Sequence, residues 1–179
     1  GNLANYAGMY CNDLIKDRII KIYNNDGPGF VKEKIDEEKF NTVKNKMVRI
    51  IPSSSIIGVT LDPFYGKTKY VKADVKGLRQ HDAFSWQVDV KRFVYEKDLT
   101  DNARKFDIAL TSMIYKLSEK ERQEFSKDIY NFVLELNKNT LLEVKSDSIR
   151  FIKFVNKMNS KTKKLFIEMI YNLIKCKLL

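Results

Sequence analysis

The sequence has 179 residues, of which 44% are hydrophobic, and it carries a formal net charge of +10. This length allows one ordinary domain with its own core, or a small core with an appended region. No run of about 18 apolar residues is present to span a bilayer, and residues 1–10 lack the pattern of a secretory signal. We therefore expect a cytoplasmic protein without a transmembrane segment.

The sequence offers few groups that could bind a metal ion. It contains one histidine, His81, and two cysteines, Cys11 and Cys176, which lie almost a chain length apart. No cysteine or histidine cluster has the spacing of a metal site, and both cysteines are expected to be reduced and buried. We expect neither a metal ion nor another cofactor.

The first half of the sequence alternates between helical and extended patterns. Residues 2–14 have helical spacing, with a stripe of small side chains on one face. Strands are expected at 18–24, 47–51 and 69–74, a helix at 30–46, and a further extended stretch or hairpin at 86–95. This alternation predicts an α/β fold with a mainly parallel sheet and crossover helices.

The pattern changes near residue 98. From Leu99 onward there is no glycine or proline, and four helices are expected, at 101–115, 119–136, 146–158 and 161–174. Ser118 with Glu121, and Ser160, have the pattern of N-terminal caps. The expected core comprises Ile114, Leu117, Phe125, Ile129, Phe132, Leu136, Phe151, Phe154, Phe166, Met169 and Leu173. We therefore predict an α/β part over residues 1–98 and an all-helical extension over 99–179.

Two polar residues follow predicted strands. Asp26 lies in an Asn-Asn-Asp-Gly-Pro-Gly turn after the first strand, and His81 lies in a loop after the third. In open parallel sheets the functional groups lie in loops at the carboxyl ends of the strands. A carboxylate and an imidazole placed there can share a hydrogen bond that fixes the histidine tautomer. The alternative is that Asp26 only forms the turn and His81 is an ordinary surface or core residue.

The order of Asp26 and His81 fits a Ser-Asp-His triad whose serine lies on a Gly-x-Ser-x-Gly turn between a strand and a helix. No such turn occurs in the sequence. Residues 1–7, Gly-Asn-Leu-Ala-Asn-Tyr-Ala, have the small side chains expected of the helix directly after it. We therefore expect the nucleophile upstream of Gly1, and residues 1–179 alone to be inactive by this mechanism.

These motifs resemble a bacterial family of lipase-like α/β-hydrolases, in which a Gly-His-Ser-x-Gly-Gly turn runs directly into an Asn-Leu-Ala helix. The resemblance covers residues 1–100, and its specific blocks are Tyr-Asn-Asn-Asp-Gly-Pro-Gly-Phe at 23–30 and Gln-His-Asp-Ala-Phe-Ser-Trp at 80–86. It implies that the chain is the C-terminal portion of such a protein. The chain would then contain the last strands of an α/β-hydrolase sheet, followed by the helical extension.

By this resemblance His81 is the base and Asp26 the acid of a triad, and the intact protein hydrolyses a small acyl or lipid ester through an acyl-enzyme. Fungal-type lipase relatives carry the acid one strand later, near residues 53–55, where this sequence has three serines and no carboxylate. Asp82 and Asp62 are alternative acids. We expect the three serines to make side-chain-to-backbone hydrogen bonds.

The positive charge suggests a second function, that of a non-enzymatic interaction module. Basic helices, with Lys153, Lys157, Lys161 and Lys164, would then bind an acidic partner, a membrane surface or nucleic acid. Lysine dominates over arginine and no nucleic-acid motif accompanies it, which argues against nucleic acid and favours a solvated surface. Peripheral membrane contact stays an alternative, and an uncovered sheet edge predicts pairing into a homodimer.

Overall fold

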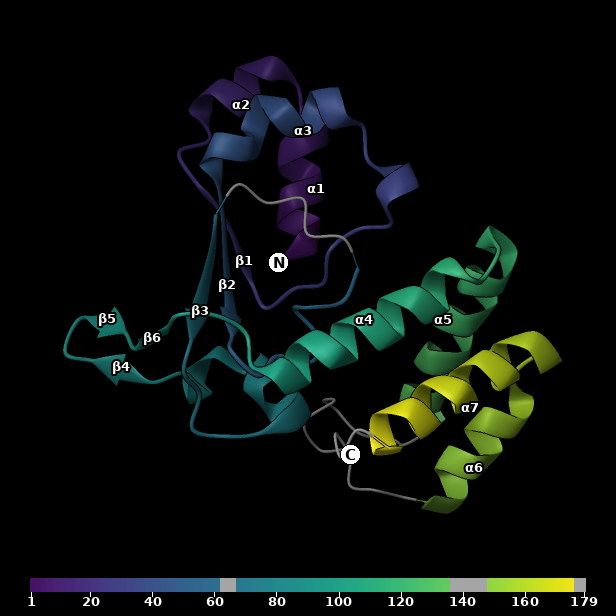
Figure 1. The fold of residues 1–179 in the computed structure, drawn as a ribbon. Helices are drawn as coiled ribbons and strands as arrows, with labels where there is room; N and C mark the ends of the chain where they lie inside the picture. The colour runs from purple at the N-terminus through teal and green to yellow at the C-terminus, as the bar shows by residue number, and fades with distance from the viewer. Residues whose placement is uncertain (62–66, 136–147, 176–179) are drawn as a thin grey trace. The chain divides into compact units, whose positions relative to one another are not determined.

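The computed structural model describes residues 1–61, 67–135 and 148–175, and Figure 1 shows its helices and strands. The chain divides into two compact units, Gly1–Asp107 and Ile108–Leu179, called here the sheet unit and the helical unit. The first contains a mostly parallel four-stranded sheet with helices, and the second is helical. The predicted α/β fold class with a helical C-terminal region is confirmed.

The sheet has the strand order β1-β2-β3-β6, in which the first three strands are parallel and β6 runs antiparallel to β3. The strands are β1 (Ile22–Asn25), β2 (Met47–Pro52), β3 (Thr68–Val71) and β6 (Tyr95–Glu96). A small hairpin of β4 (Val88–Asp89) and β5 (Arg92–Phe93) extends away from the sheet (Figure 1). The parallel arrangement brings the carboxyl ends of β1, β2 and β3 to one edge of the sheet.

The helices of the sheet unit are shorter than the sequence pattern predicts. They are α1 (Asn2–Tyr10), α2 (Asp13–Arg18) and α3 (Glu37–Val43), with 3₁₀ turns η1 (Lys32–Lys34), η2 (Lys44–Lys46), η3 (Gly77–His81) and η4 (Ala83–Ser85). The single helix expected at 2–14 is wrong because Asn12 starts a new helix by accepting a hydrogen bond from the Ile15 N–H. The helix expected at 30–46 begins only after Asp36, whose side chain caps α3. The first strand begins at Ile22 because α2 continues to Arg18.

The core of the sheet unit lies on both faces of β2. Successive side chains of a strand point to opposite faces. Met47 packs with α1, α3 and β1 around Met9, Ile22, Phe40 and Val43. On the opposite face, Ile50 packs against Val71 and Trp86. The sheet is therefore covered on both sides, and polar groups at its carboxyl edge are held on a rigid support.

The helical unit contains the four helices that the sequence predicts, α4 (Asp101–Tyr115, which begins in the sheet unit), α5 (Glu119–Glu135), α6 (Ser148–Lys157) and α7 (Ser160–Lys175). The predicted cap of α5 is confirmed: the Ser118 N–H donates to Glu121 Oε2 at 2.7 Å, and the Glu121 N–H donates to Ser118 Oγ at 3.3 Å. The predicted cap at Ser160 is wrong. Asn159 caps α7 by accepting from the Thr162 N–H at 2.9 Å.

The core of the helical unit is apolar and rich in phenylalanine. Six of its predicted members are buried, Leu117, Phe125, Phe154, Phe166, Met169 and Leu173. Ile129 and Phe151 are instead exposed, at 41% and 39%, because they lie at the edge of the packed face. Leu136 lies outside the described residues. Within the described residues, no helix has the length and apolar character needed to cross a membrane.

Candidate active site

Asp26 lies at the carboxyl end of β1, in a turn that its neighbours stabilise. The Asn24 side chain accepts a hydrogen bond from the Gly27 N–H at 2.7 Å, and the Asp26 N–H donates to the Ile50 carbonyl of β2 at 2.8 Å. Asp26 has a φ of 52°, in the left-handed region that aspartate tolerates better than most residues. Its side chain is 1% exposed. The turn thus directs a buried carboxylate across the ends of the neighbouring strands.

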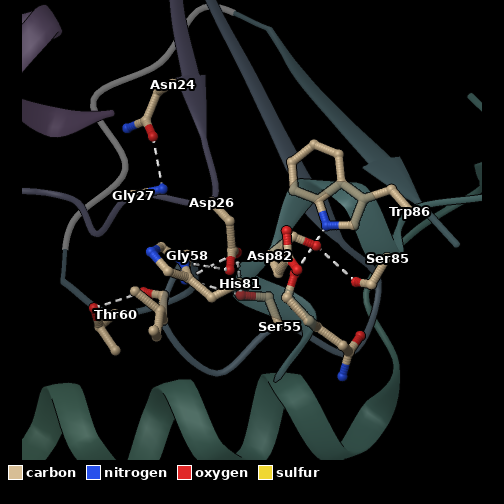
Figure 2. A network of polar contacts seen from close by, with 12 residues as sticks. Asn24, Asp26, Gly27, Ser55, Gly58, Thr60, His81, Asp82, Ser85 and Trp86 are labelled. Carbon is tan, nitrogen blue, oxygen red and sulfur yellow. Dashed lines mark hydrogen bonds and ion pairs between the residues drawn. The ribbon is translucent and has the colours of Figure 1, made fainter. Parts of the chain in front are cut away.

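His81 meets this carboxylate from a segment 55 residues further along the chain. It is the last residue of η3, and its Nδ1 lies 3.1 Å from Asp26 Oδ2 (Figure 2). The histidine side chain is 41% exposed, whereas the aspartate is buried. Because Nδ1 is engaged by the carboxylate, Nε2 is the ring nitrogen left to exchange a proton with a bound molecule.

The electrostatic environment of His81 favours its charged form. The hydrogen bond that Nδ1 donates to Asp26 raises the pKa of the imidazole above 6.5, against the opposing effect of burial. The aspartate therefore stabilises the imidazolium, as expected when a histidine must accept a proton during a reaction.

The second carboxylate oxygen of Asp26 is held by the loop that follows β2. Ser55 Oγ donates to Oδ1 at 2.5 Å, and the Gly58 N–H donates to the same oxygen at 3.1 Å. The Gly58 N–H also contacts Ser55 Oγ at 2.8 Å. Figure 2 shows Ser55, Gly58 and His81 converging on the carboxylate. The expected side-chain-to-backbone hydrogen bond of a serine is confirmed at Ser55, but its contact with Asp26 was not predicted.

Gly58 has no room for a side chain. A Cβ atom there would lie 2.2 Å from Asp26 Oδ1 and 2.8 Å from Ile51 Cγ2, so a larger residue would have to displace one of them. The carbonyl of Gly58 accepts a hydrogen bond from the buried guanidinium of Arg49. The Gly58 peptide is thus fixed on one side by Arg49 and presents its N–H to Asp26 on the other.

The segment that carries His81 is tied to the loop after β2. Gln80, which is 4% exposed, donates from its side chain to the Ser54 carbonyl at 3.2 Å. The indole N–H of the buried Trp86 donates to the Gln80 carbonyl at 2.8 Å. Gln80 precedes His81 directly, and Trp86 follows it five residues later. These two hydrogen bonds fix the backbone beside His81.

The first residue of α1 packs against the turn that carries Asp26. A Cβ on Gly27 would lie 3.1 Å from the Cα of Gly1 and 2.9 Å from the N of Asn2. A Cβ on Gly1 would overlap the Asn24 side chain at 2.0 Å. Small residues on both sides therefore allow α1 to start directly beside the Asp26 turn.

Asp82 and Asp62 were the alternative candidates for the acid that contacts His81. The Asp82 side chain accepts from the Phe84 N–H at 3.0 Å and caps η4, and Asp26 is the residue that contacts His81. Asp62 lies outside the described residues. Among the residues that the structure describes, no group of three or more histidine, cysteine, aspartate or glutamate side chains could hold a metal ion.

Lysines of the helical unit form ion pairs with acidic side chains of the same unit. Two of the four lysines considered for an acidic partner already have acidic neighbours within the helical unit. Lys157 pairs with Glu135, and Lys161 pairs with Glu121 at 2.8 Å. Pairing of this kind is typical of a solvated helical surface.

A mostly parallel sheet with polar side chains in the loops at its strand ends is the arrangement of the open α/β folds, which include the α/β-hydrolases. The sequence matches the Mbeg1-like family over residues 1–131, and the chain belongs to that family, which is lipase-like and related to the α/β-hydrolases. Searches of curated proteins and of solved structures gave no significant match. The predicted lipase-like resemblance is confirmed at this level.

Proposed function

We propose that the protein is a serine hydrolase of the esterase or lipase-like type, in which His81 is the general base and Asp26 is the acid that orients it. The observation that carries this proposal is the 3.1 Å contact of Asp26 Oδ2 with His81 Nδ1, made by a buried carboxylate to a half-exposed imidazole. With Nδ1 taken by the carboxylate, Nε2 is the ring nitrogen that can accept a proton from a serine hydroxyl.

In the proposed reaction, Nε2 of His81 accepts the proton of a serine hydroxyl as its oxygen attacks the ester carbonyl. Collapse of the tetrahedral intermediate breaks the ester bond, and the imidazolium returns the proton to the leaving alcohol. Water then attacks the acyl-enzyme with the same histidine as base, releasing the carboxylic acid. Asp26 stays ionised throughout and stabilises the imidazolium in each step.

The nucleophile in this proposal lies in the segment that precedes Gly1. Two observations support that position. Gly1 lies against the Asp26 turn. The serine nearest to the pair, Ser55, is fully buried and donates to Asp26, so it is not placed to attack a substrate. A Gly-x-Ser-x-Gly turn that enters α1 at Gly1 would bring its serine to the exposed side of the imidazole.

The free edge of β1 supports the same arrangement. Within the described residues, β1 pairs only with β2, and α1 packs against β1. A strand leading into α1 would form a strand–helix–strand unit with α1 and β1 and would lie parallel to β1, and such crossovers are almost always right-handed. The nucleophile turn would then stand at the carboxyl end of that strand, in line with Asp26.

The proposed substrates are small acyl or lipid esters. Their support comes from the apolar side chains that lie near the base in sequence. Leu78 and Phe84 stand three residues on either side of His81, and they are 41% and 100% exposed. Apolar side chains beside a catalytic histidine favour an acyl chain over a charged substrate.

The test uses the protein that includes the segment preceding Gly1, with p-nitrophenyl butyrate as substrate. We expect turnover that falls about 10³-fold or more in His81→Ala, because the general base is lost. Asp89→Asn, an exposed aspartate on β4, is the matched control and should leave turnover unchanged. Turnover that persists in His81→Ala would contradict the proposal. His81-dependent turnover by residues 1–179 alone would show a different nucleophile.

A further inference from the structure

We propose that Ser55 is a positioning residue for the triad acid: its hydroxyl and the N–H of Gly58 hold Oδ1 of Asp26 so that Oδ2 faces His81. This inference rests on the proposed function, because Asp26 positions His81 only if that pair is catalytic. It assigns a role to a serine that the sequence marks only as one of three consecutive serines.

The two carboxylate oxygens of Asp26 have different hydrogen-bond partners. Oδ1 receives Ser55 Oγ at 2.5 Å and the Gly58 N–H at 3.1 Å, and Oδ2 is left for His81 at 3.1 Å. Rotation of the carboxylate would break all three contacts. Because the Asp26 N–H is bonded to Ile50 of β2, the backbone cannot follow such a rotation easily.

The direction of the Ser55 hydrogen bond follows from its other contact. The Gly58 N–H donates to Ser55 Oγ at 2.8 Å, so the hydroxyl is an acceptor there and its own proton is available for Asp26. A hydroxyl that both accepts from the loop and donates to a buried carboxylate fixes the orientation of that carboxylate. Ser55 is fully buried, so no solvent molecule competes for this contact at its surface.

A role in the local turn alone would not require the contact with Asp26. The bond from the Gly58 N–H to Ser55 Oγ is sufficient to stabilise the turn of residues 55–58. The additional donation to a carboxylate that itself contacts His81 links the loop after β2 to the base. This link predicts that a change at Ser55 alters the titration of His81.

The experiment uses the fact that His81 is the only histidine in residues 1–179. Its imidazole resonances can be titrated by NMR without ambiguity in the wild-type chain, in Ser55→Ala and in Ser53→Ala. Ser53 is the matched control, because it belongs to the same three serines and the structure shows no side-chain bond from it to Asp26 among the described residues.

Without the Ser55 hydroxyl, Oδ1 of Asp26 loses one of the two donors that hold it, so the carboxylate can turn and its contact with His81 Nδ1 weakens. We expect the pKa of His81 to fall by about half a unit in Ser55→Ala and to stay at the wild-type value in Ser53→Ala. In the protein with the upstream segment, we expect kcat for p-nitrophenyl butyrate to fall roughly threefold to tenfold with KM unchanged. The acid limb of the kcat/KM profile should move to lower pH.

The outcomes separate this inference from the proposed function. An unchanged or higher pKa of His81 in Ser55→Ala overturns the positioning role, whatever the activity. A lower pKa of His81 in Ser55→Ala, together with no ester turnover by the wild-type protein, supports the link through Asp26 and removes the catalytic proposal. If Ser55→Ala does not fold, Ser55→Cys replaces it, because a thiol keeps the shape of the side chain and is a much weaker donor.

Discussion

The two units of the chain place their polar residues differently. The buried polar residues Asn5, Asn24, Asp26, Arg49, Ser55 and Gln80 all belong to the sheet unit, whereas Thr162 is the one found in the described part of the helical unit. The helical unit instead packs phenylalanine rings, such as Phe132 and Phe154 at 4.6 Å between ring centroids. Buried polar groups are costly unless they are paired, and the sheet unit, which holds most of them, is also the unit of the proposed Asp26–His81 site.

The largest expected effect is on catalysis in the sheet unit. Replacement of Asp26 by asparagine, in the protein with its upstream segment, should lower kcat about 10⁴-fold, because an amide can hold the imidazole in the wrong tautomer. In residues 1–179 the pKa of His81 should fall below its wild-type value, since the raising effect of the carboxylate is lost and the lowering effect of burial persists. Ester kinetics and NMR titration measure the two effects. A His81 pKa equal to that of wild type would contradict the site geometry.

The helical unit should respond in stability and not in the titration of His81. Phe154→Ala removes a buried ring that contacts Phe132 and Phe166, and should lower the free energy of unfolding by about 3 kcal/mol. Urea unfolding followed by circular dichroism measures this loss. Phe151→Ala is the matched control with a smaller expected loss, because that ring is 39% exposed. A shift of the His81 pKa in Phe154→Ala would show that packing in the helical unit affects the site in the sheet unit.

A smaller structural effect is expected at Gly58. Gly58→Ala adds a methyl group against Asp26 Oδ1 and Ile51, and should lower the free energy of unfolding by about 2 kcal/mol. It should also change the pKa of His81, because the carboxylate is displaced. Thermal unfolding and NMR titration of the same variant test both expectations. A variant with wild-type stability and titration would show that the loop after β2 yields without moving Asp26.

The smallest expected effect is the contribution of Glu121, on the surface of the helical unit, to the pH dependence of stability. Hydrogen bonds from Lys161 and from Ser118 lower the pKa of Glu121 to about 2. A carboxyl group whose pKa is lower in the folded than in the unfolded chain stabilises the fold above its unfolded pKa of 4.5, and this stabilisation is lost as the pH falls toward 2. In Glu121→Gln, the free energy of unfolding should fall less than in wild type as the pH is lowered from 4.5 to about 2. Identical acid-unfolding curves would contradict the cap and ion pair.

The comparison of the units also explains what the sequence could predict. Local periodicity and the Ser118–Glu121 cap depend on residues close in the chain, so all four helices of the second half were predicted to within a few residues. Asp26 and His81 were recognised as candidates because each follows a strand of a parallel sheet. Their hydrogen bond joins residues 55 positions apart, and it depends on the register of the strands between them.

The roles of Ser55 and Gly58 could not be predicted in the same way. A serine-rich strand exit followed by a glycine is common in turns that do no more than reverse the chain. What distinguishes this turn is the buried carboxylate 29 residues earlier that Ser55 contacts, and only the folded arrangement of β1 and β2 reveals it. The helix boundaries at Asn12 and Asp36 were missed for a related reason, because capping side chains interrupt a continuous apolar pattern.

The most direct test of the proposed triad is labelling of the protein with its upstream segment by a fluorophosphonate, followed by peptide mapping. These probes react with a serine that a histidine base has activated. The account predicts a single labelled serine in the segment that enters α1 at Gly1, with labelling lost in His81→Ala. Labelling of Ser55 or of another serine within residues 1–179, or labelling that persists without His81, would contradict it.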